Sequence, residues 1–385
     1  MKSHNHAINP GKITMEQFEE CKSHDFVIEA ALMPDAHVGY AAPIGSVLIT
    51  KGKVVPAWVG FDIGCGMTSA HLEDITIEKI KQHTEEIYNK VKESVPMGLG
   101  MTSSLEDVTK ETKEKFNEIL EKFKKGPYNP NILEFLERKA LKHLGSLGEG
   151  NHFIELGKYN DEVWITVHSG SRGIGFQVAE KYMKKSAGSD QNFEATFPLD
   201  VDSELGKEYL NVLDFGLEFA LLNRLEIIRK TIIAISDILN KKLEYEVWTN
   251  KNHNHAILED NTFIHRKGAT PAKKGERGVI PGNMKEGCFL VEGLGKDNFL
   301  NSSSHGAGRI MSRSGAKNNI TMEEFKESMV GIRGTITEGT LDEAPMAYKN
   351  IYDVMEAQKD SVKVLKHLTP VINWKGDNKR KKWRK

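Results

Sequence analysis

The chain has 385 residues, with 53 Lys and Arg against 54 Asp and Glu, so its formal net charge is −1. Hydrophobic residues make up 39% and charged residues 28%, a balance that excludes a wholly disordered chain. Charges interrupt every apolar stretch well before about 18 residues, so we expect no membrane span. The near-zero net charge argues against a protein that coats nucleic acid through its bulk charge. It does not argue against a local basic groove that binds nucleic acid.

The N-terminal sequence MKSHNHAINPGK lacks the apolar core of a signal peptide, so we expect the protein to stay in the cytoplasm. The three cysteines, Cys21, Cys65 and Cys288, are too few for a disulfide framework in a chain of this length.

Residues 26–67 are short β-rich runs separated by Gly, Pro and Asp, a pattern that predicts strands joined by tight turns. Residues 75–93 and 104–125 are charged and compatible with helix. This part of the chain is therefore predicted to be an inserted helical layer rather than a core.

A strand is predicted over residues 160–168. The pattern over 204–242 is helical, and its apolar residues are too dense for one exposed face, which predicts a buried helix. Strands and turns return at 245–300, followed by helices near 321–330 and 346–367.

No stretch has the composition of a long flexible linker, so the pattern favours one α/β domain over residues 1–385. That domain would carry a helical insertion at about 75–145 and a basic C-terminal tail at 376–385. The last eleven residues hold seven basic side chains and one acidic residue. These residues are compatible with two interpretations, a solvated tail and an arm that contacts phosphate.

Four clusters of His, Cys or acidic residues stand out, and all but one are rich in glycine. Glycine lets a backbone approach a ligand closely, and side chains on such turns are well placed for catalysis. The clusters are MPDAHVG (33–39) with GFDIGCGM (60–67), LGEGNHFIE (147–155) with VHSGSRG (167–173), NHNHA (252–256), and SSSHGAGR (302–309).

These clusters contain the residue types of a metal site. Asp62 and Cys65 lie three apart in one turn, and His152, His168 and His253 follow in the other clusters. A thiolate combined with imidazoles and carboxylates suits a transition-series ion such as Mn²⁺ or Zn²⁺. Because no paired CxxC or HExxH spacing is present, a hydrogen-bonded structural imidazole stays open for each histidine.

The sequence contains no P-loop and no complete GxGxxG motif. A phosphate site would therefore need glycine-turn amides together with Arg172, Arg309, Arg313 or Lys267. His305, between serines and a GAGR turn, could attack phosphorus or could be a structural turn residue.

The clusters together resemble the RtcB RNA ligases from about residue 33 to Lys375. The resemblance runs through motifs in the same order: MPDAHVGYAAPIG, GFDIGCGM, LGEGNHFIE, HSGSRGIG, HNHA, HRKGATPAKKGERGVIPGNM, SSSHGAGRIMSR, DEAPMAYKNI and VINWKG. It implies a single RtcB-like α/β domain of mixed β-sheets packed with flanking helices and a helical insertion.

The resemblance also implies a GTP- and Mn²⁺-dependent RNA ligase. Such an enzyme joins an RNA 3′-phosphate or 2′,3′-cyclic phosphate end to a 5′-hydroxyl end, in RNA repair or tRNA splicing. It passes through a covalent histidine–GMP and an RNA(3′)pp(5′)G intermediate. An archease-like activator is a further partner that the resemblance raises.

Carried over to this chain, the resemblance makes His305 the guanylated nucleophile. It implies two Mn²⁺ ions bridged by the thiolate, with the ligands Asp62, Cys65, His152, His168 and His253. Arg172 and Arg309 would hold the RNA terminal phosphate, and Asp35 and His37 would support the metal ligands from behind. The implied GTP contacts are Asn151, Glu155, Asn254, Pro281, Gly282, Asn283, Met284, His305, Gly306, Ala307, Gly308, Arg309, Tyr348 and Lys375.

Two departures from the family pattern are visible. The HNxA motif carries an extra imidazole, His255, and Asn283 stands where serine or aspartate is frequent. Two other functions remain open: a metal-dependent phosphoesterase that opens RNA 2′,3′-cyclic ends without using His305, and an RNA-binding accessory protein.

Overall fold

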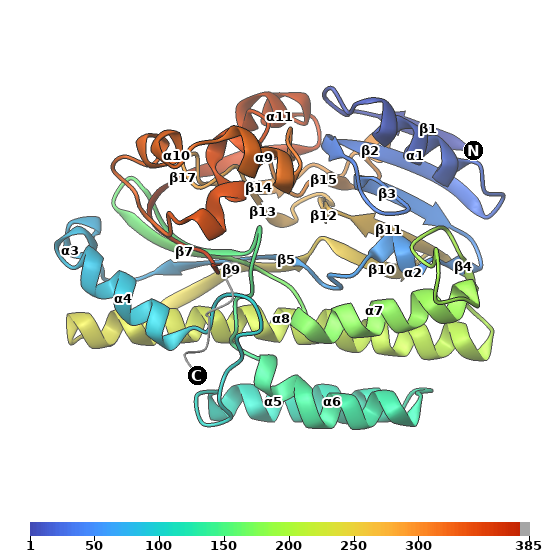
Figure 1. Cartoon of the computed structure of the whole chain (residues 1–385), viewed down its shortest axis with the longest axis horizontal. Helices are drawn as coiled ribbons and strands as arrows, with labels where there is room; N and C mark the ends of the chain where they lie inside the picture. The colour runs from blue at the N-terminus through green and yellow to red at the C-terminus, as the bar shows by residue number, and fades with distance from the viewer. Residues whose placement is uncertain (378–385) are drawn as a thin grey trace.

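The computed structural model describes residues 1–377, and Figure 1 shows two β-sheets with helices on their outer faces. Strand pairing within both sheets is mostly antiparallel with single parallel pairs, β1 with β2 and β16 with β17. The mixed α/β architecture is therefore confirmed. The predicted basic tail lies almost wholly outside the described residues.

The larger sheet has eight strands in the order β13-β14-β17-β6-β7-β5-β9, with β16 paired to β17. Its two edge strands approach each other, because the Thr249 hydroxyl donates to the Arg277 carbonyl over 3.2 Å. The sheet therefore curls towards closure. The strand bounds are β5 Gly66–Leu72, β6 Phe153–Tyr159, β7 Glu162–Ser169, β9 Tyr245–Asn252, β13 Arg277–Pro281, β14 Cys288–Gly293, β16 Arg333–Gly334 and β17 Val362–Trp374.

The smaller sheet has five strands in the order β1-β2-β3-β11-β10. It is joined to the larger sheet where β9 ends at Asn252 and β10 begins at Asn254, so His253 lies at the junction. Two-stranded pieces, β4 with β8 and β12 with β15, complete the strands. Their bounds are β1 Lys2–Asn5, β2 Val27–His37, β3 Ile44–Thr50, β4 Lys53–Val54, β8 Leu199–Asp200, β10 Asn254–Glu259, β11 Thr262–Lys267, β12 Ala269–Pro271 and β15 Ser302–Ser304.

Helix α8 (Glu204–Leu239) runs the length of the molecule beneath the larger sheet (Figure 1). The Ser203 hydroxyl accepts from the Gly206 amide and caps its start, and left-handed Asn240 ends it. The helix packs against β5, β7 and β9 on one side and against α4 and α5 on another. The burial predicted for this segment is confirmed, and its reason is contact on several faces.

An inserted helical layer lies between β5 and β6, as predicted. The Phe116 and Phe123 rings of α5 pack against Phe215 of α8, which fastens this layer to the core. Its helices are α3 Ile77–Gln82, α4 Thr84–Ser94, α5 Lys110–Lys124 and α6 Pro130–His143.

The prediction of a helix over 346–367 is wrong for its second half. After the short helix α11 (Ile351–Ala357), residues from Val362 onward form β17 in the middle of the larger sheet. The run VKVLKHL alternates and is β-branched, and pairing with β14 and β6 decides its conformation. Similarly, Pro56–Val59 (α2) is a buried helical turn within a segment predicted as strand, with proline at its first position.

The remaining helices flank the sheets (Figure 1). Among the described residues, no helix combines the length and the apolar character that crossing a membrane requires. The bounds are α1 Lys12–Lys22, α7 Arg172–Ala187, α9 Arg313–Asn319, α10 Met322–Ser328, and the 3₁₀ turns η1 Asp297–Phe299, η2 Glu338–Glu343 and η3 Pro345–Ala347.

Candidate active site

Strand order in the larger sheet brings the metal-ligand candidates together. On β7, His168 pairs with Met67 of β5 and with Phe153 of β6. Gly66 of β5 in turn pairs with Asn252 of β9. Residues at the ends of β6, β7, β5 and β9 are therefore neighbours in space, although they are distant in sequence.

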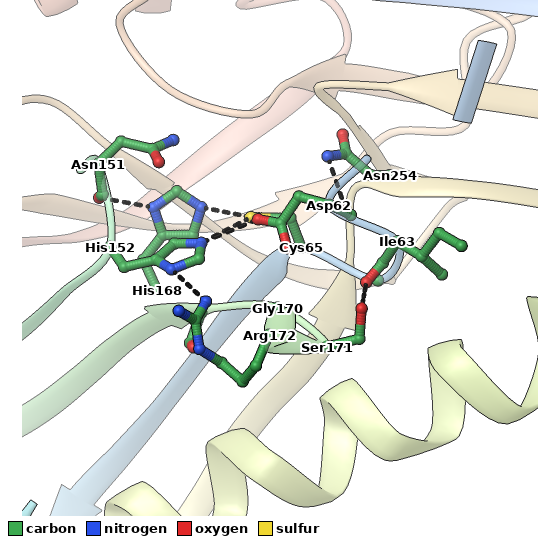
Figure 2. A network of polar contacts seen from close by, with 12 residues as sticks. Asp62, Ile63, Cys65, Asn151, His152, His168, Gly170, Ser171, Arg172 and Asn254 are labelled. Carbon is green, nitrogen blue, oxygen red and sulfur yellow. Dashed lines mark hydrogen bonds and ion pairs between the residues drawn. The ribbon is translucent and has the colours of Figure 1, made fainter. Parts of the chain in front are cut away.

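Cys65 lies at the centre of the resulting cluster (Figure 2). Its Sγ is 3.1 Å from His168 Nε2 and 3.4 Å from His152 Nε2. His253 Nε2 is 3.3 Å from His168 Nε2, and Asp62 Oδ2 is 2.9 Å from His152 Nε2. The structure thus brings together all five predicted metal ligands.

Burial sets the protonation of this cluster. It lowers the pKa of His168 and His253 well below the usual value, so both imidazoles are neutral and keep a lone pair. Burial alone would raise the pKa of Asp62, but His152 and Arg172 more than offset it and hold that pKa well below its usual range. Burial, and next the Asp62 charge, raise the pKa of the Cys65 thiol.

The donor set fits a divalent transition ion. Cys65, His152 and His168 offer one sulfur and two nitrogens within 4.8 Å of one another, enough to hold a metal ion. His168 Nδ1 lies 3.1 Å from the Asn151 carbonyl and donates to it, which leaves Nε2 free to coordinate (Figure 2). A buried thiol among neutral imidazoles becomes a ligand once a cation replaces its proton.

His305 lies beside this cluster, on the turn after β15. Its ring centroid is 4.9 Å from that of His253. Its Nδ1 is 2.7 Å from Asp35 Oδ2, and the same carboxylate oxygen accepts from the backbone amides of His305 and Gly306. A carboxylate oxygen this close to Nδ1 favours a proton on Nδ1 over a lone pair there, which leaves the Nε2 lone pair available.

Asp35 and His37 were expected to support the metal ligands, and the structure places the Asp35 carboxylate against His305. Asp35 is fully buried on β2, and His37 Nδ1 donates to the Asp35 carbonyl over 3.0 Å. The GAGR turn can lie this close because Gly308 has φ of +75°, and a Cβ there would come within 2.2 Å of the Asp35 carbonyl oxygen.

A cavity of about 1010 Å³ opens beside His305. His168 is the one metal-ligand candidate in its lining, while Arg172 and Asn254 lie outside it among the described residues. The predicted GTP contacts in the lining are Asn151, Glu155, Pro281, Gly282, Asn283, Met284, His305, Gly306, Ala307, Gly308, Arg309, Tyr348 and Lys375. Sequence motifs that are far apart thus line one continuous space.

Glu343 organises the far wall of this cavity and was missed from the sequence. Its carboxylate accepts from the Tyr348 hydroxyl over 2.6 Å, from Lys375 Nζ over 3.1 Å and from Arg309 Nη1 over 3.2 Å. Burial would raise its pKa, but Lys375 and Arg309 more than offset this and lower it. The available signal was its place in DEAPMAYKNI, five residues before Tyr348.

The two arginines predicted to hold phosphate are engaged differently. Arg309 donates to the Met311 and Asp342 carbonyls as well as to Glu343, so its guanidinium is tied into the cavity wall. Arg172 Nη1 donates to His152 Nδ1 over 2.9 Å, directly beside the metal-ligand cluster (Figure 2).

Glu155 faces the same cavity from β6. It accepts from Asn373 Nδ2 over 3.2 Å and lies beside the Cys288 thiol. Burial raises its pKa to about 7, so this side chain gains and loses a proton near neutral pH.

Asn223 and Arg224, both buried on α8, hold the segments that carry the ligands, and the sequence analysis missed both. Arg224 Nη1 donates to the carbonyls of Gly64 and Ser169, each over 2.9 Å, and Nη2 donates to Asn252 Oδ1 over 2.7 Å. These three acceptors are the chain neighbours of Cys65, His168 and His253. The available signal was a polar pair directly after the apolar run FALL.

The NHNHA segment separates its two imidazoles. Asn254 Nδ2 donates to the Asp62 carbonyl over 3.1 Å, and its Oδ1 accepts from the Gly268 amide over 2.8 Å. His255 lies apart from the metal-ligand cluster, with Nε2 3.2 Å from Arg266 Nη1. His255 is therefore a buried structural imidazole.

Comparison with known proteins agrees with this arrangement. A family model described as tRNA-splicing ligase RtcB matches residues 17–376. The chain is 34% identical over 369 residues to RNA-splicing ligase RtcB of Escherichia coli K12, covering 90% of each chain. It is 29% identical to tRNA-splicing ligase RtcB of Nanoarchaeum equitans, covering 90% of this chain and 87% of the relative. RNA-splicing ligase RtcB homolog 1 of Entamoeba histolytica is 28% identical, covering 91% and 81%.

Proposed function

This chain belongs to the RtcB family and is an RNA ligase, and we propose that it seals RNA ends with GTP and Mn²⁺ through a histidine–GMP intermediate. The ends would be a 3′-phosphate or 2′,3′-cyclic phosphate and a 5′-hydroxyl, arising in RNA repair or tRNA splicing. An archease-like protein is a candidate activator. The observation that carries the proposal is a histidine with a free Nε2 between the metal-ligand cluster and a cavity of nucleotide size.

In the first step, His305 Nε2 attacks the α-phosphorus of GTP. A P–N bond forms, the bond from that phosphorus to the β-phosphate oxygen breaks, and pyrophosphate leaves. The imidazole becomes cationic as it attacks, and the Asp35 carboxylate at Nδ1 stabilises that charge.

The ligand set proposed for two Mn²⁺ ions is Asp62, Cys65, His152, His168 and His253. Cys65 would hold metal together with His152 and His168, because its Sγ lies near both of these imidazoles. Bound metal supplies charge stabilisation at the reacting phosphate and lowers the pKa of an attacking hydroxyl.

The guanine and ribose would occupy the part of the cavity lined by Tyr348 and Lys375. Lys375 donates to Glu343 and to the Gly150 carbonyl, which leaves one of its three N–H groups for the guanine oxygen. Glu343 therefore fixes the direction of that lysine.

In the later steps, an oxygen of the RNA 3′-phosphate takes the guanylate from His305, and the neutral imidazole leaves. The RNA 5′-hydroxyl then attacks the 3′-phosphorus and GMP departs, which creates the phosphodiester. A cyclic end would be opened by hydrolysis first. Arg172 would hold the terminal phosphate. Arg309 would assist with fewer N–H groups, because it already donates to the Asp342 carbonyl.

The test is incubation of the full chain with α-labelled GTP and Mn²⁺, followed by denaturing electrophoresis. The proposal predicts a covalent label that His305→Ala abolishes and that His83→Ala, a control at a surface histidine paired with Glu86, retains. If His305→Ala instead keeps the label, another side chain is the nucleophile and the proposal for His305 is wrong. If His305→Ala opens 2′,3′-cyclic ends normally while the wild-type chain takes no label, the phosphoesterase alternative is favoured.

A further inference from the structure

We propose that Tyr40, Phe61 and Phe176 form an aromatic platform on which a nucleobase of single-stranded RNA stacks beside the end being joined. The inference rests on the proposed RNA-sealing function and names the part of the substrate that this surface contacts. Nothing in the mechanism above uses these rings.

Three segments bring the rings together at the surface. The Phe61 and Phe176 rings stack, with centroids 4.9 Å apart and planes 22° apart, and the Tyr40 ring meets Phe61 edge-on at 6.0 Å. Tyr40 is 62% exposed and Phe176 is 49% exposed. A group of large aromatic rings exposed on one surface is typical of an interaction site, whereas rings that serve only packing are buried.

The platform is held in place before any ligand arrives. Gln17 Nε2 donates to the Gly39 carbonyl over 2.6 Å, and the Gly39 amide donates back to Gln17 Oε1 over 3.2 Å. Lys267 Nζ donates to the Tyr40 carbonyl. The exposed Tyr40 ring is therefore carried by a fixed backbone, which lowers the entropy that binding would cost.

The platform is continuous with the proposed active site. Tyr40 lines the same cavity as His305, and Phe61 directly precedes the ligand candidate Asp62. Phe176 follows Arg172 by four residues in α7. An RNA strand that placed its terminal phosphate at Arg172 would bring a neighbouring base onto these rings.

The charges nearby favour nucleic acid over an apolar protein partner. Lys267, Arg313 and Lys349 line the cavity together with Tyr40. Backbone phosphates would be attracted to these cations while the bases stack on the rings.

The experiment uses the full chain with Mn²⁺ and a short single-stranded RNA bearing a 3′-phosphate and a 2-aminopurine base near that end. Stacking quenches 2-aminopurine fluorescence, so one titration gives both the affinity and the stacking. Phe176→Ala and Tyr40→Ala are expected to relieve the quenching and to weaken RNA binding about tenfold or more, given the usual contribution of base–aromatic stacking. Phe176→Tyr keeps an aromatic ring, so it is expected to quench 2-aminopurine and to bind RNA as the wild-type chain does.

Two further variants sharpen the result. Tyr352→Ala removes a 51% exposed ring on α11, outside the platform, and should bind and quench as wild type does. Phe176→Leu keeps apolar area but loses the aromatic face, so full retention of binding and quenching by it would point to an apolar partner and overturn the proposal.

Covalent labelling by GTP in the wild-type chain tests the proposed function separately. If labelling occurs but Phe176→Ala and Tyr40→Ala bind and quench like wild type, the platform is refuted and the ligase chemistry stands. If labelling fails but these variants lose quenching, the platform stands and the ligase chemistry is refuted.

Discussion

At the scale of single residues, the contact of Asp35 with His305 supports the role proposed for this histidine as the nucleophile. The carboxylate accepts from two backbone amides of the turn and lies 2.7 Å from the imidazole Nδ1, so it holds the turn in place and favours one tautomer of the ring. The carboxylate charge should matter most when the imidazole becomes cationic.

Replacing that carboxylate by its neutral isostere tests this role. Asp35→Asn should slow formation of the covalent GMP adduct by about 10²-fold or more, because the cationic imidazole loses its counter-charge and the tautomer is no longer fixed. The rate is measured by single-turnover labelling, with thermal unfolding as the control for folding. A labelling rate equal to wild type in a folded variant would show that Asp35 has no part in the reaction.

Glu155 predicts a pH dependence of stability. Its pKa is about 7 in the folded chain against an ordinary value of 4.5, so between these pH values the folded state binds more protons than the unfolded state. The free energy of unfolding should therefore fall as pH rises from 4.5 to 7, by about 3 kcal/mol from this group. Glu155→Gln should remove that contribution.

The measurement is urea unfolding of metal-free wild type and Glu155→Gln at pH 5 and pH 8. Because other groups titrate in the same window, the difference between the two proteins isolates this carboxyl group. A difference that stays constant across the window would refute the raised pKa.

Some of these residues could be predicted from the sequence and others could not. The resemblance assigned the motif residues Cys65, His168 and His305 to one site, and the structure brings these side chains close together. The contact of Asp35 with His305 and the place of Glu343 in the cavity wall were not predicted, because each depends on a contact between strands or turns distant in sequence. Such contacts follow from strand order, which local patterns do not encode.

At the scale of elements, α8 does more than fill the core. Through Asn223 and Arg224 it binds the chain on either side of the metal-ligand candidates. Asn223 accepts from the Gly145 amide over 2.8 Å and donates to the Ser146 and Gly170 carbonyls, so it reaches the remaining segments. The helix thereby fixes the spacing of strands β5, β7 and β9.

Arg224→Met should weaken Mn²⁺ binding at least tenfold and lower the free energy of unfolding by about 1–3 kcal/mol for each buried acceptor left without a donor. Isothermal titration with Mn²⁺ and urea unfolding measure the two effects. Arg229→Met is the matched control, since Arg229 lies on the same helix but bonds Thr112 and Glu111 away from the cluster. Equal metal affinity in the two variants would contradict the role of Arg224.

The prediction of helices and strands was right for long periodic segments and wrong where pairing with neighbouring strands determines the conformation. The density of apolar residues in 204–242 required a buried helix, and α8 is one. The segment ending in Trp374 carries lysines at helix-like spacing, yet pairing on both edges makes it a central strand. Pro56–Val59 shows the reverse case, in which a turn of helix interrupts a β-rich run.

At the scale of the whole molecule, the metal-ligand cluster lies where the two sheets meet. His253 sits between β9 and β10, while the other ligand candidates belong to the larger sheet and its turns. The cluster is therefore complete only when both sheets are in place. Metal binding should consequently stabilise the fold as a whole.

Mn²⁺ at about 100 times its dissociation constant should raise the free energy of unfolding by about 2.7 kcal/mol. Thermal unfolding with Mn²⁺ and after treatment with a chelator measures this change. His253→Ala should lose most of the Mn²⁺-dependent increase, while His83→Ala, at a surface position, should keep it. An unchanged increase in His253→Ala would place the metal elsewhere.

The architecture itself was predicted only in outline. The ordered motifs implied an α/β domain of mixed sheets with a helical insertion, and the structure has these features. The order of strands and the meeting of the sheets at His253 could not be predicted, because they depend on pairings such as that of Gly66 with Asn252, which are far apart in the sequence.

The central claim is that His305 carries the guanylate. Its most direct test is mass spectrometry of peptides from the full chain after incubation with GTP and Mn²⁺, under conditions that preserve a P–N bond. The account predicts an added mass of GMP less water on the peptide that contains the SSSHGAGR turn, at the histidine. The same mass on any other residue, with that peptide unmodified, would contradict it.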